Sequence, residues 1–170
     1  MVTSKGARNK IRLSKIKVLV VDDDKAISNL VKNVLTNLGF GTVLVVHNGE
    51  EGFDVIQNNQ IDLLITDWEM DPLSGVDLTK KIRMLEPPKR FLPIIMLTGH
   101  SERHDIEVAR DSGITEYLIK PFTAKTLCSR IMMVVESPRS FILSKNYKGP
   151  SRRRRSAEPS NGVERRKKKS

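Results

Sequence analysis

Between residues 17 and 136 the chain alternates short apolar runs with longer segments in which apolar residues recur every three or four positions. The short runs are typical of buried strands, and the longer segments are typical of amphipathic helices. The expected strands cover residues 17–21, 42–46, 61–65, 92–97 and 117–119. The expected helices cover residues 27–38, 50–57, 76–85, 102–111 and 124–135.

This strict alternation of strand and helix predicts an α/β fold. Strands joined by helices of this length are parallel with right-handed crossovers, so we expect a doubly wound, five-stranded parallel sheet. A chain of 170 residues with 38% hydrophobic residues can bury one core. We therefore expect one domain over residues 16–137, with largely disordered tails over residues 1–15 and 138–170. Within the second tail, the apolar residues Phe141–Leu143 could pack back on the domain.

The net charge of +10 is unevenly distributed along the chain. Residues 1–17 hold 6 basic and no acidic residues, and residues 138–170 hold 12 basic and 2 acidic residues. Residues 18–137 hold 12 basic and 18 acidic residues, a net charge of −6. The tails could bind nucleic acid, an acidic partner or an anionic membrane surface, or they could be solvated and only nonspecifically adhesive.

Other features of the composition limit the class of protein. No apolar stretch approaches the roughly 18 residues of a membrane span, and no amino-terminal apolar run resembles a signal peptide. The single cysteine, Cys128, excludes an internal disulfide. These features favour a cytoplasmic protein.

Polar residues with useful chemistry follow four of the five expected strands. They are Asp22, Asp23 and Asp24 after the first strand, Asp67 after the third, Thr98 after the fourth and Lys120 after the fifth. An acidic residue after one strand is ordinarily a loop or capping residue. The carboxyl ends of parallel strands meet at one edge of a doubly wound sheet, however, so these residues are expected to share a site.

Such a site suits phosphoryl transfer. Neighbouring carboxylates repel one another unless a cation joins them, and Mg²⁺ accepts a few hard carboxylate oxygens together with water. A metal ion, the Lys120 ammonium and the Thr98 hydroxyl could neutralise phosphoryl oxygens while a carboxylate attacks. Asp67 is the candidate nucleophile because its strand is central.

Four motifs together resemble the receiver domain of bacterial two-component response regulators, most closely the single-domain, CheY-like kind. The motifs are Val20–Asp23, Asp67–Met70 with Gly75 eight residues after Asp67, Met96–Gly99, and Tyr117–Phe122. They occur in the family's order and spacing over roughly residues 16 to 137. The resemblance implies the flavodoxin-like strand order 2-1-3-4-5, in a signalling protein whose only reactions are its own phosphorylation and dephosphorylation.

The resemblance also implies a role for each site residue. Asp67 would accept a phosphoryl group from a phosphohistidine on a sensor histidine kinase or phosphotransfer protein. The side chains of Asp23 and Asp67 and the backbone carbonyl of Glu69 would bind Mg²⁺, and Asp22 would bind it directly or through water. The output could be chemotaxis or a phosphorelay.

Thr98 and Lys120 would contact the phosphoryl oxygens. Thr98 and Tyr117 would then form a switch that remodels the face made by the fourth helix, the fifth strand and the fifth helix, where a downstream target would bind. Such a domain would have two conformations, and the change of charge at Asp67 would shift the equilibrium between them.

The chain departs from the family pattern around this site. Asp71 stands where the family usually has Pro, with Pro72 one place later, and Gly99 replaces the commoner Ala. We expect Gly99 to open the pocket, and we expect Glu69 to influence the lifetime of the phosphoryl group.

Other residues have less specific interpretations. Asp24 is expected to cap a helix, Trp68 to lie partly exposed at the rim of the site, and the Lys120–Pro121 bond could be cis. His47, His100 and His104 are interpreted as surface residues.

Two other functions fit parts of the sequence. A haloacid-dehalogenase-type phosphatase would use Asp22 as nucleophile and Asp24 as acid, but it needs a further acidic pair after the lysine. Past Lys120 the only acids are Glu136, Glu158 and Glu164. A receiver whose basic tails bind nucleic acid is the second alternative, although residues 138–170 contain no recognisable DNA-reading fold.

Overall fold

The computed structural model describes residues 12–153. Its central strands are β1 (Lys17–Val21), β2 (Thr42–Val46), β3 (Leu63–Asp67), β4 (Ile94–Thr98) and β5 (Glu116–Ile119). Its helices are α1 (Lys25–Leu38), α2 (Gly49–Asn58), α3 (Gly75–Arg83), α4 (Arg103–Ser112) and α5 (Ala124–Glu136), with short 3₁₀ helices at Leu13–Lys15 and Lys89–Phe91. Two further strands, β6 (Phe141–Leu143) and β7 (Lys148–Pro150), follow α5.

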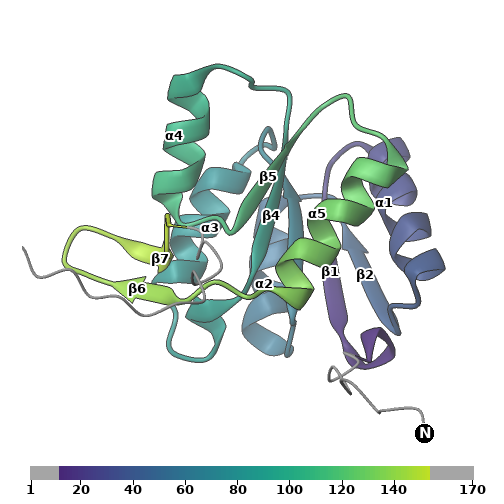
Figure 1. Ribbon diagram of the computed structural model, residues 1–170, viewed down its shortest axis with the longest axis horizontal. Helices are drawn as coiled ribbons and strands as arrows, with labels where there is room; N and C mark the ends of the chain where they lie inside the picture. Colours follow the sequence, from purple (N-terminus) through teal and green to yellow (C-terminus); the bar gives the residue numbers. More distant parts are fainter. Residues whose placement is uncertain (1–11, 154–170) are drawn as a thin grey trace, which may run out of the picture.

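The five central strands form one parallel sheet in the order β2-β1-β3-β4-β5 (Figure 1). This arrangement confirms the predicted doubly wound fold and its strand order. Because β1 and β3 are neighbours, the residues that follow Val21 and Thr66, which pair across the two strands, come close together. The topology thus places the two main acidic segments beside each other.

Two apolar layers pack on the sheet. Side chains of α1 and α5, such as Leu35 and Ile131, cover one face, and side chains of α2, α3 and α4, such as Ile56 and Ile82, cover the other. The strands β3 and β4 are buried along their whole length. This burial on both faces explains why their sequences are continuously apolar rather than alternating.

The ends of α1 follow the sequence signals closely. The carboxylate of Asp24 accepts hydrogen bonds from the backbone nitrogens of Ala26 and Ile27, as expected for an N-cap. Gly39 ends the helix with φ of 94°, in the left-handed region that favours glycine.

The fourth strand differs from the prediction, since Leu92 and Pro93 precede β4. The Leu92 nitrogen donates to the Lys89 carbonyl of the 3₁₀ turn instead of joining the sheet.

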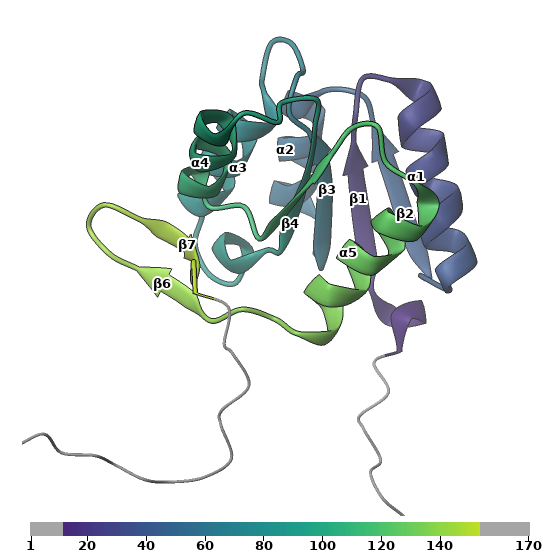
Figure 2. The ribbon, with the colours of Figure 1, turned by 45° about the horizontal axis from the view of Figure 1, so that its top comes forward.

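The segment after α5 differs from the expected disordered tail. Residues 138–153 are ordered, and β6 and β7 pair antiparallel as a hairpin beside the carboxyl-terminal end of α4 (Figure 2). The ring of Phe141 meets the ring of Phe91 edge-on at 4.9 Å between centroids, and Arg152 forms a 2.7 Å ion pair with Asp111 of α4. The rest of the expected tails, residues 1–11 and 154–170, lies outside the described residues.

A buried arginine lies beneath this hairpin. Arg83, at the end of α3, is 2% exposed and donates hydrogen bonds to the carbonyls of Gly113, Arg90 and Leu92 at 2.7 to 3.0 Å. Its guanidinium also lies 5.2 Å from the centre of the Phe141 ring. Arg83 thereby links α3, the turn before β4, the end of α4 and the hairpin.

Within residues 12–153, the structure contains no helix with the length and apolar character to cross a membrane.

Candidate functional site

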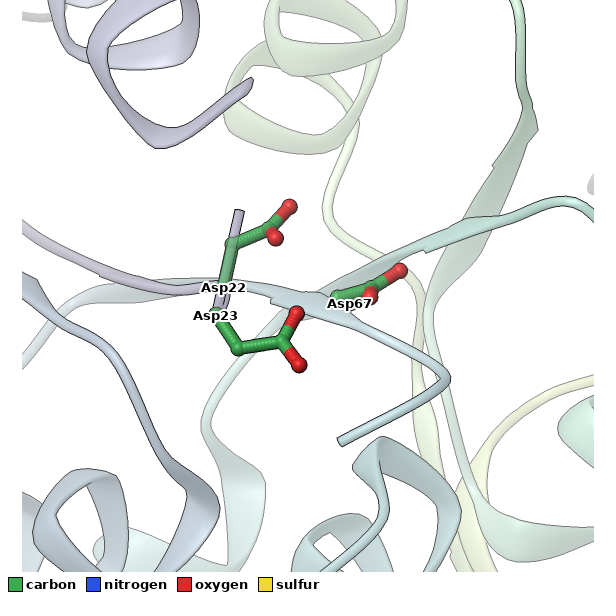
Figure 3. A group of neighbouring side chains, drawn as sticks. All are labelled: Asp22, Asp23 and Asp67. Carbon is green, nitrogen blue, oxygen red and sulfur yellow. The ribbon is translucent and has the colours of Figure 1, made fainter. Parts of the chain in front are cut away.

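Three carboxylates predicted to share a site do come together. Asp22 and Asp23 directly follow β1, and Asp67 is the last residue of the neighbouring β3. One carboxylate oxygen from each of the three residues lies within 4.8 Å of the others (Figure 3). Like charges at this spacing repel one another, so the cluster calls for a cation.

The carboxylate of Asp22 is fully buried and only partly satisfied. Its Oδ1 accepts a 2.9 Å hydrogen bond from the backbone nitrogen of Asp24. Within the described residues its Oδ2 has no hydrogen-bond partner, and the Lys120 Nζ lies 3.7 Å away, beyond hydrogen-bond distance. Burying a carboxylate oxygen without a hydrogen-bond donor costs free energy, and a bound metal ion would remove that cost.

Burial dominates the electrostatics of the site. It raises the pKa of Asp22 to about 6, against a hydrogen bond from Asp24 that lowers it, and the negative charge of Asp67 adds to the rise. Burial also raises the pKa of Asp67, although the hydrogen bond from Lys120 opposes this. For Lys120, burial alone would lower the pKa, but the carboxylates of Asp67 and Asp22 outweigh burial and raise it.

The donor set fits Mg²⁺. Three carboxylates supply hard oxygen ligands on one side and leave room for water and substrate oxygens, which is the coordination that Mg²⁺ favours. Asp23 and Glu69 also line a surface hollow of about 440 Å³ beside Trp68. The predicted coordination by the Glu69 carbonyl stays a prediction.

Lys120 and Thr98 flank Asp67 from the other side. The Lys120 Nζ donates a 2.8 Å hydrogen bond to Asp67 Oδ1, and the Lys120–Pro121 bond is cis, as the sequence suggested. The Thr98 side chain is buried at the end of β4, and its Oγ1 accepts a 2.8 Å hydrogen bond from the His100 nitrogen. A cationic donor and a hydroxyl therefore lie next to the acidic cluster.

Tyr117 lies two residues before the carboxyl end of β5. It is half-buried in β5, where it is in register with Met96 of β4, and it packs against the apolar layer shared by α2, α3 and α4. The structure thus places Tyr117 on the strand next to the one that carries Thr98. Its part in a switch stays a prediction.

The loop after Asp67 turns back tightly onto its own strand. The Gly75 nitrogen donates a 2.8 Å hydrogen bond to the Trp68 carbonyl, and a Cβ at residue 75 would collide with the Asp67 carbonyl oxygen. Only glycine permits this approach. The Asp71–Pro72 bond in this loop is cis. At Gly99, in contrast, an added Cβ would meet no atom within 4 Å, in agreement with an open pocket.

Sequence reasoning missed the contribution of His100 to the rim of the site. Its Nε2 lies 2.8 Å from Glu69 Oε1, its Nδ1 lies 3.3 Å from Asp105 Oδ2, and its ring lies 4.9 Å from the ring of Trp68. The contact holds the half-exposed Trp68 and the Glu69 side chain at the edge of the hollow. The only sequence signal was its position two residues after Thr98.

Asp24 does not join the acidic cluster, because its carboxylate caps α1. The dehalogenase-type interpretation requires this carboxylate as its acid. The geometry therefore argues against that alternative.

We expect Asp22→Asn to stabilise the metal-free protein at neutral pH. With a pKa of about 6 in the folded state, Asp22 binds its proton more tightly there than in the unfolded chain. Wild-type stability therefore falls as the pH rises from about 4 through about 6, by at most about 3 kcal/mol from this group. Urea unfolding in a chelator would measure the difference between variant and wild type across this range.

The same variant should bind Mg²⁺ less tightly, because it removes the charge of one of the three carboxylates that could hold the ion. Asp54→Asn is a control, since Asp54 lies on α2 outside the cluster. A stability difference between Asp22→Asn and wild type that stayed constant from pH 4 to pH 7 would contradict the assigned cause.

Comparisons with known proteins agree with this geometry. Residues 18–132 match the model of the response regulator receiver domain. The chain is 36% identical over 121 residues to chemotaxis protein CheY-3 of Vibrio cholerae, covering 71% of this chain and 92% of that protein. It is 34% identical to chemotaxis protein CheY of Pseudomonas aeruginosa, covering 71% and 97%.

Solved structures show the same similarity. The chemotaxis response regulator CheY4 of Vibrio cholerae superimposes with a TM-score of 0.65 at 31% identity, covering 70% of this chain and 98% of that chain. A two-component response regulator from Clostridium difficile gives a TM-score of 0.66 at 28% identity, covering 74% and 100%. The sequence match, the fold and the acidic strand ends agree, and the chain belongs to the response regulator receiver domain family.

Proposed function

We propose that this protein is a CheY-like response regulator that accepts a phosphoryl group on Asp67 and thereby changes its binding to a downstream target. The observation that carries the proposal is that Asp67 belongs to an acidic cluster that could hold a metal ion and also accepts a hydrogen bond from the Lys120 ammonium. The donor would be a phosphohistidine on a sensor histidine kinase or phosphotransfer protein. The similarity to chemotaxis proteins favours chemotaxis as the output.

In the proposed reaction, an oxygen of Asp67 forms a bond to phosphorus while the bond from phosphorus to the donor nitrogen breaks. The electron pair of the broken bond stays on the histidine. Mg²⁺ at Asp22, Asp23 and Asp67 would supply positive charge that stabilises the developing charge on the phosphoryl oxygens. Lys120 supplies a second positive charge by shifting its hydrogen bond from Asp67 toward the same oxygens.

The signal would leave the site through Thr98. Its buried hydroxyl, which accepts from His100, would turn to bond the phosphoryl group. Tyr117, on the neighbouring strand, would occupy the released space and alter the face formed by α4, β5 and α5. One charge change would thus bias a two-state surface.

Incubation with Mg²⁺ and a small phosphodonor tests this proposal. We expect mass spectrometry to detect one added phosphoryl group, and we expect Mg²⁺ alone to change the fluorescence of Trp68, the only tryptophan. A chelator should prevent both changes. Unchanged mass and fluorescence in the presence of Mg²⁺ and donor would reject the proposal.

A further inference from the structure

The hairpin formed by β6, β7 and their connecting loop projects from the domain beside α3 and α4 (Figures 1 and 2). Exposed apolar side chains gather here. Ile142 is 42% exposed and Leu143 is 53% exposed. Nearby, Met84 is 66% exposed beside the Lys148 ammonium, and Phe91 is 40% exposed against Phe141. These are four of the seven large apolar side chains exposed in the described part of the chain.

The two aliphatic residues lie on opposite faces of the hairpin. Successive residues of a strand point to opposite faces, and Ile142 is in register with Gly149 whereas Leu143 is in register with Lys148. A partner that covered one face would leave the other aliphatic side chain in water. A medium that surrounds the tip of the hairpin would bury both.

The hairpin and the residues that flank it are basic. Residues 138–153 carry five basic side chains and no acidic ones. Arg139 and Arg152 are paired with Glu116 and Asp111, whereas the ion pairs between residues 12 and 153 engage none of Lys145, Lys148 and Arg153. The sequence continues with Arg154 and Arg155 and with five more basic residues at positions 165–169.

We propose that this hairpin docks the protein on an anionic lipid surface. Ile142 and Leu143 would enter the boundary between headgroups and acyl chains, while Lys145, Lys148 and Arg153 would contact anionic headgroups. A small apolar anchor or a basic cluster alone binds membranes weakly, but the two together give reversible attachment. This arrangement attaches the domain to a surface without a membrane-spanning helix.

The apolar side chains favour lipid over nucleic acid. Nucleic-acid backbones are bound by cations and hydrogen-bond donors, and exposed aliphatic side chains add nothing to phosphate contacts. Binding to nucleic acid would therefore depend on the basic residues and not on Ile142 or Leu143. This difference separates the two partners by experiment.

Co-sedimentation of the full chain with vesicles tests the proposal. We expect binding to phosphatidylcholine vesicles that contain phosphatidylglycerol, little binding to phosphatidylcholine alone, and weaker binding at high salt. The double variant Ile142→Ser/Leu143→Ser should bind at least about tenfold more weakly. Replacing Lys145 and Lys148 with Gln should weaken binding about fivefold for each charge.

The matched control is Leu30→Ser/Leu44→Ser, which changes two other aliphatic side chains, 39% and 37% exposed, away from the hairpin. It should bind like wild type. Thermal unfolding should show that all variants are folded. Their phosphorylation should be unaffected, because the hairpin contacts Phe91 and Asp111, which precede β4 and β5 at the end of the sheet opposite to Asp67.

Three results would overturn the proposal. The first is no binding to anionic vesicles at low salt, and the second is equal binding by wild type and Ile142→Ser/Leu143→Ser. The third is a gel shift in which DNA binds wild type and this variant equally while vesicles bind neither, which would assign the basic surface to nucleic acid.

Discussion

We expect Asp67→Asn to reduce phosphoryl uptake from a small phosphodonor below detection. Asp67 is 6% exposed, forms part of the three-carboxylate cluster and accepts the 2.8 Å hydrogen bond from Lys120. The amide of Asn retains nearly the same shape but supplies no carboxylate nucleophile and one less anionic ligand. Mass spectrometry after incubation with Mg²⁺ and donor would measure the loss.

Asp71→Asn is the matched control for this variant, because Asp71 is an exposed acid in the same loop. It should still take up the phosphoryl group. The buried Asp22 and the exposed Asp23 are the other carboxylates within reach. If Asp67→Asn gained the mass of a phosphoryl group as wild type does, one of them would be the acceptor, and the central role of Asp67 would be wrong.

The sequence contained enough information to predict this cluster because the strands are parallel. Polar residues after Val21 and at Asp67 lie at the same end of adjacent strands, so local patterns and one topological rule bring distant positions together. Caps such as Asp24 and Gly39 were equally predictable, since their signals involve only a few neighbouring residues.

Features that depend on side-chain direction or on long-range docking were predictable only in part: the apolar run Phe141–Leu143 indicated packing on the domain, but nothing indicated the hairpin. His100 shows no ligand spacing, yet the turn after β4 places its ring against Trp68 and Glu69. The segment after α5 has too few apolar residues to form its own core, and its hairpin is ordered by contacts on α4 and on Phe91. Composition indicates whether a segment can form an apolar core of its own, but it does not show which neighbouring surface the segment packs against.

The buried position of Arg83 was also not predictable from the sequence. Among the variants considered, replacement of Arg83 should cause the largest loss of stability. We expect Arg83→Met to lower the free energy of unfolding by about 3 kcal/mol. Burial lowers the pKa of Arg83 to about 10, so the side chain remains charged at neutral pH. Replacement by Met removes the unfavourable burial of that charge but leaves the carbonyls of Gly113, Arg90 and Leu92 without their donor. Urea unfolding at neutral pH would measure the change.

Two further variants separate geometry from charge. Arg83→Lys keeps the positive charge, but one ammonium cannot reproduce a planar fork that reaches three carbonyls, so an intermediate loss is expected. Arg103→Met removes an arginine that is 93% exposed and should change stability by less than about 0.5 kcal/mol. Equal stability of Arg83→Met and wild type would mean that burying the charge offsets its hydrogen bonds completely. In that case the contact of Phe141 with Phe91 and the ion pair of Arg152 with Asp111 would be enough to hold the hairpin on the domain.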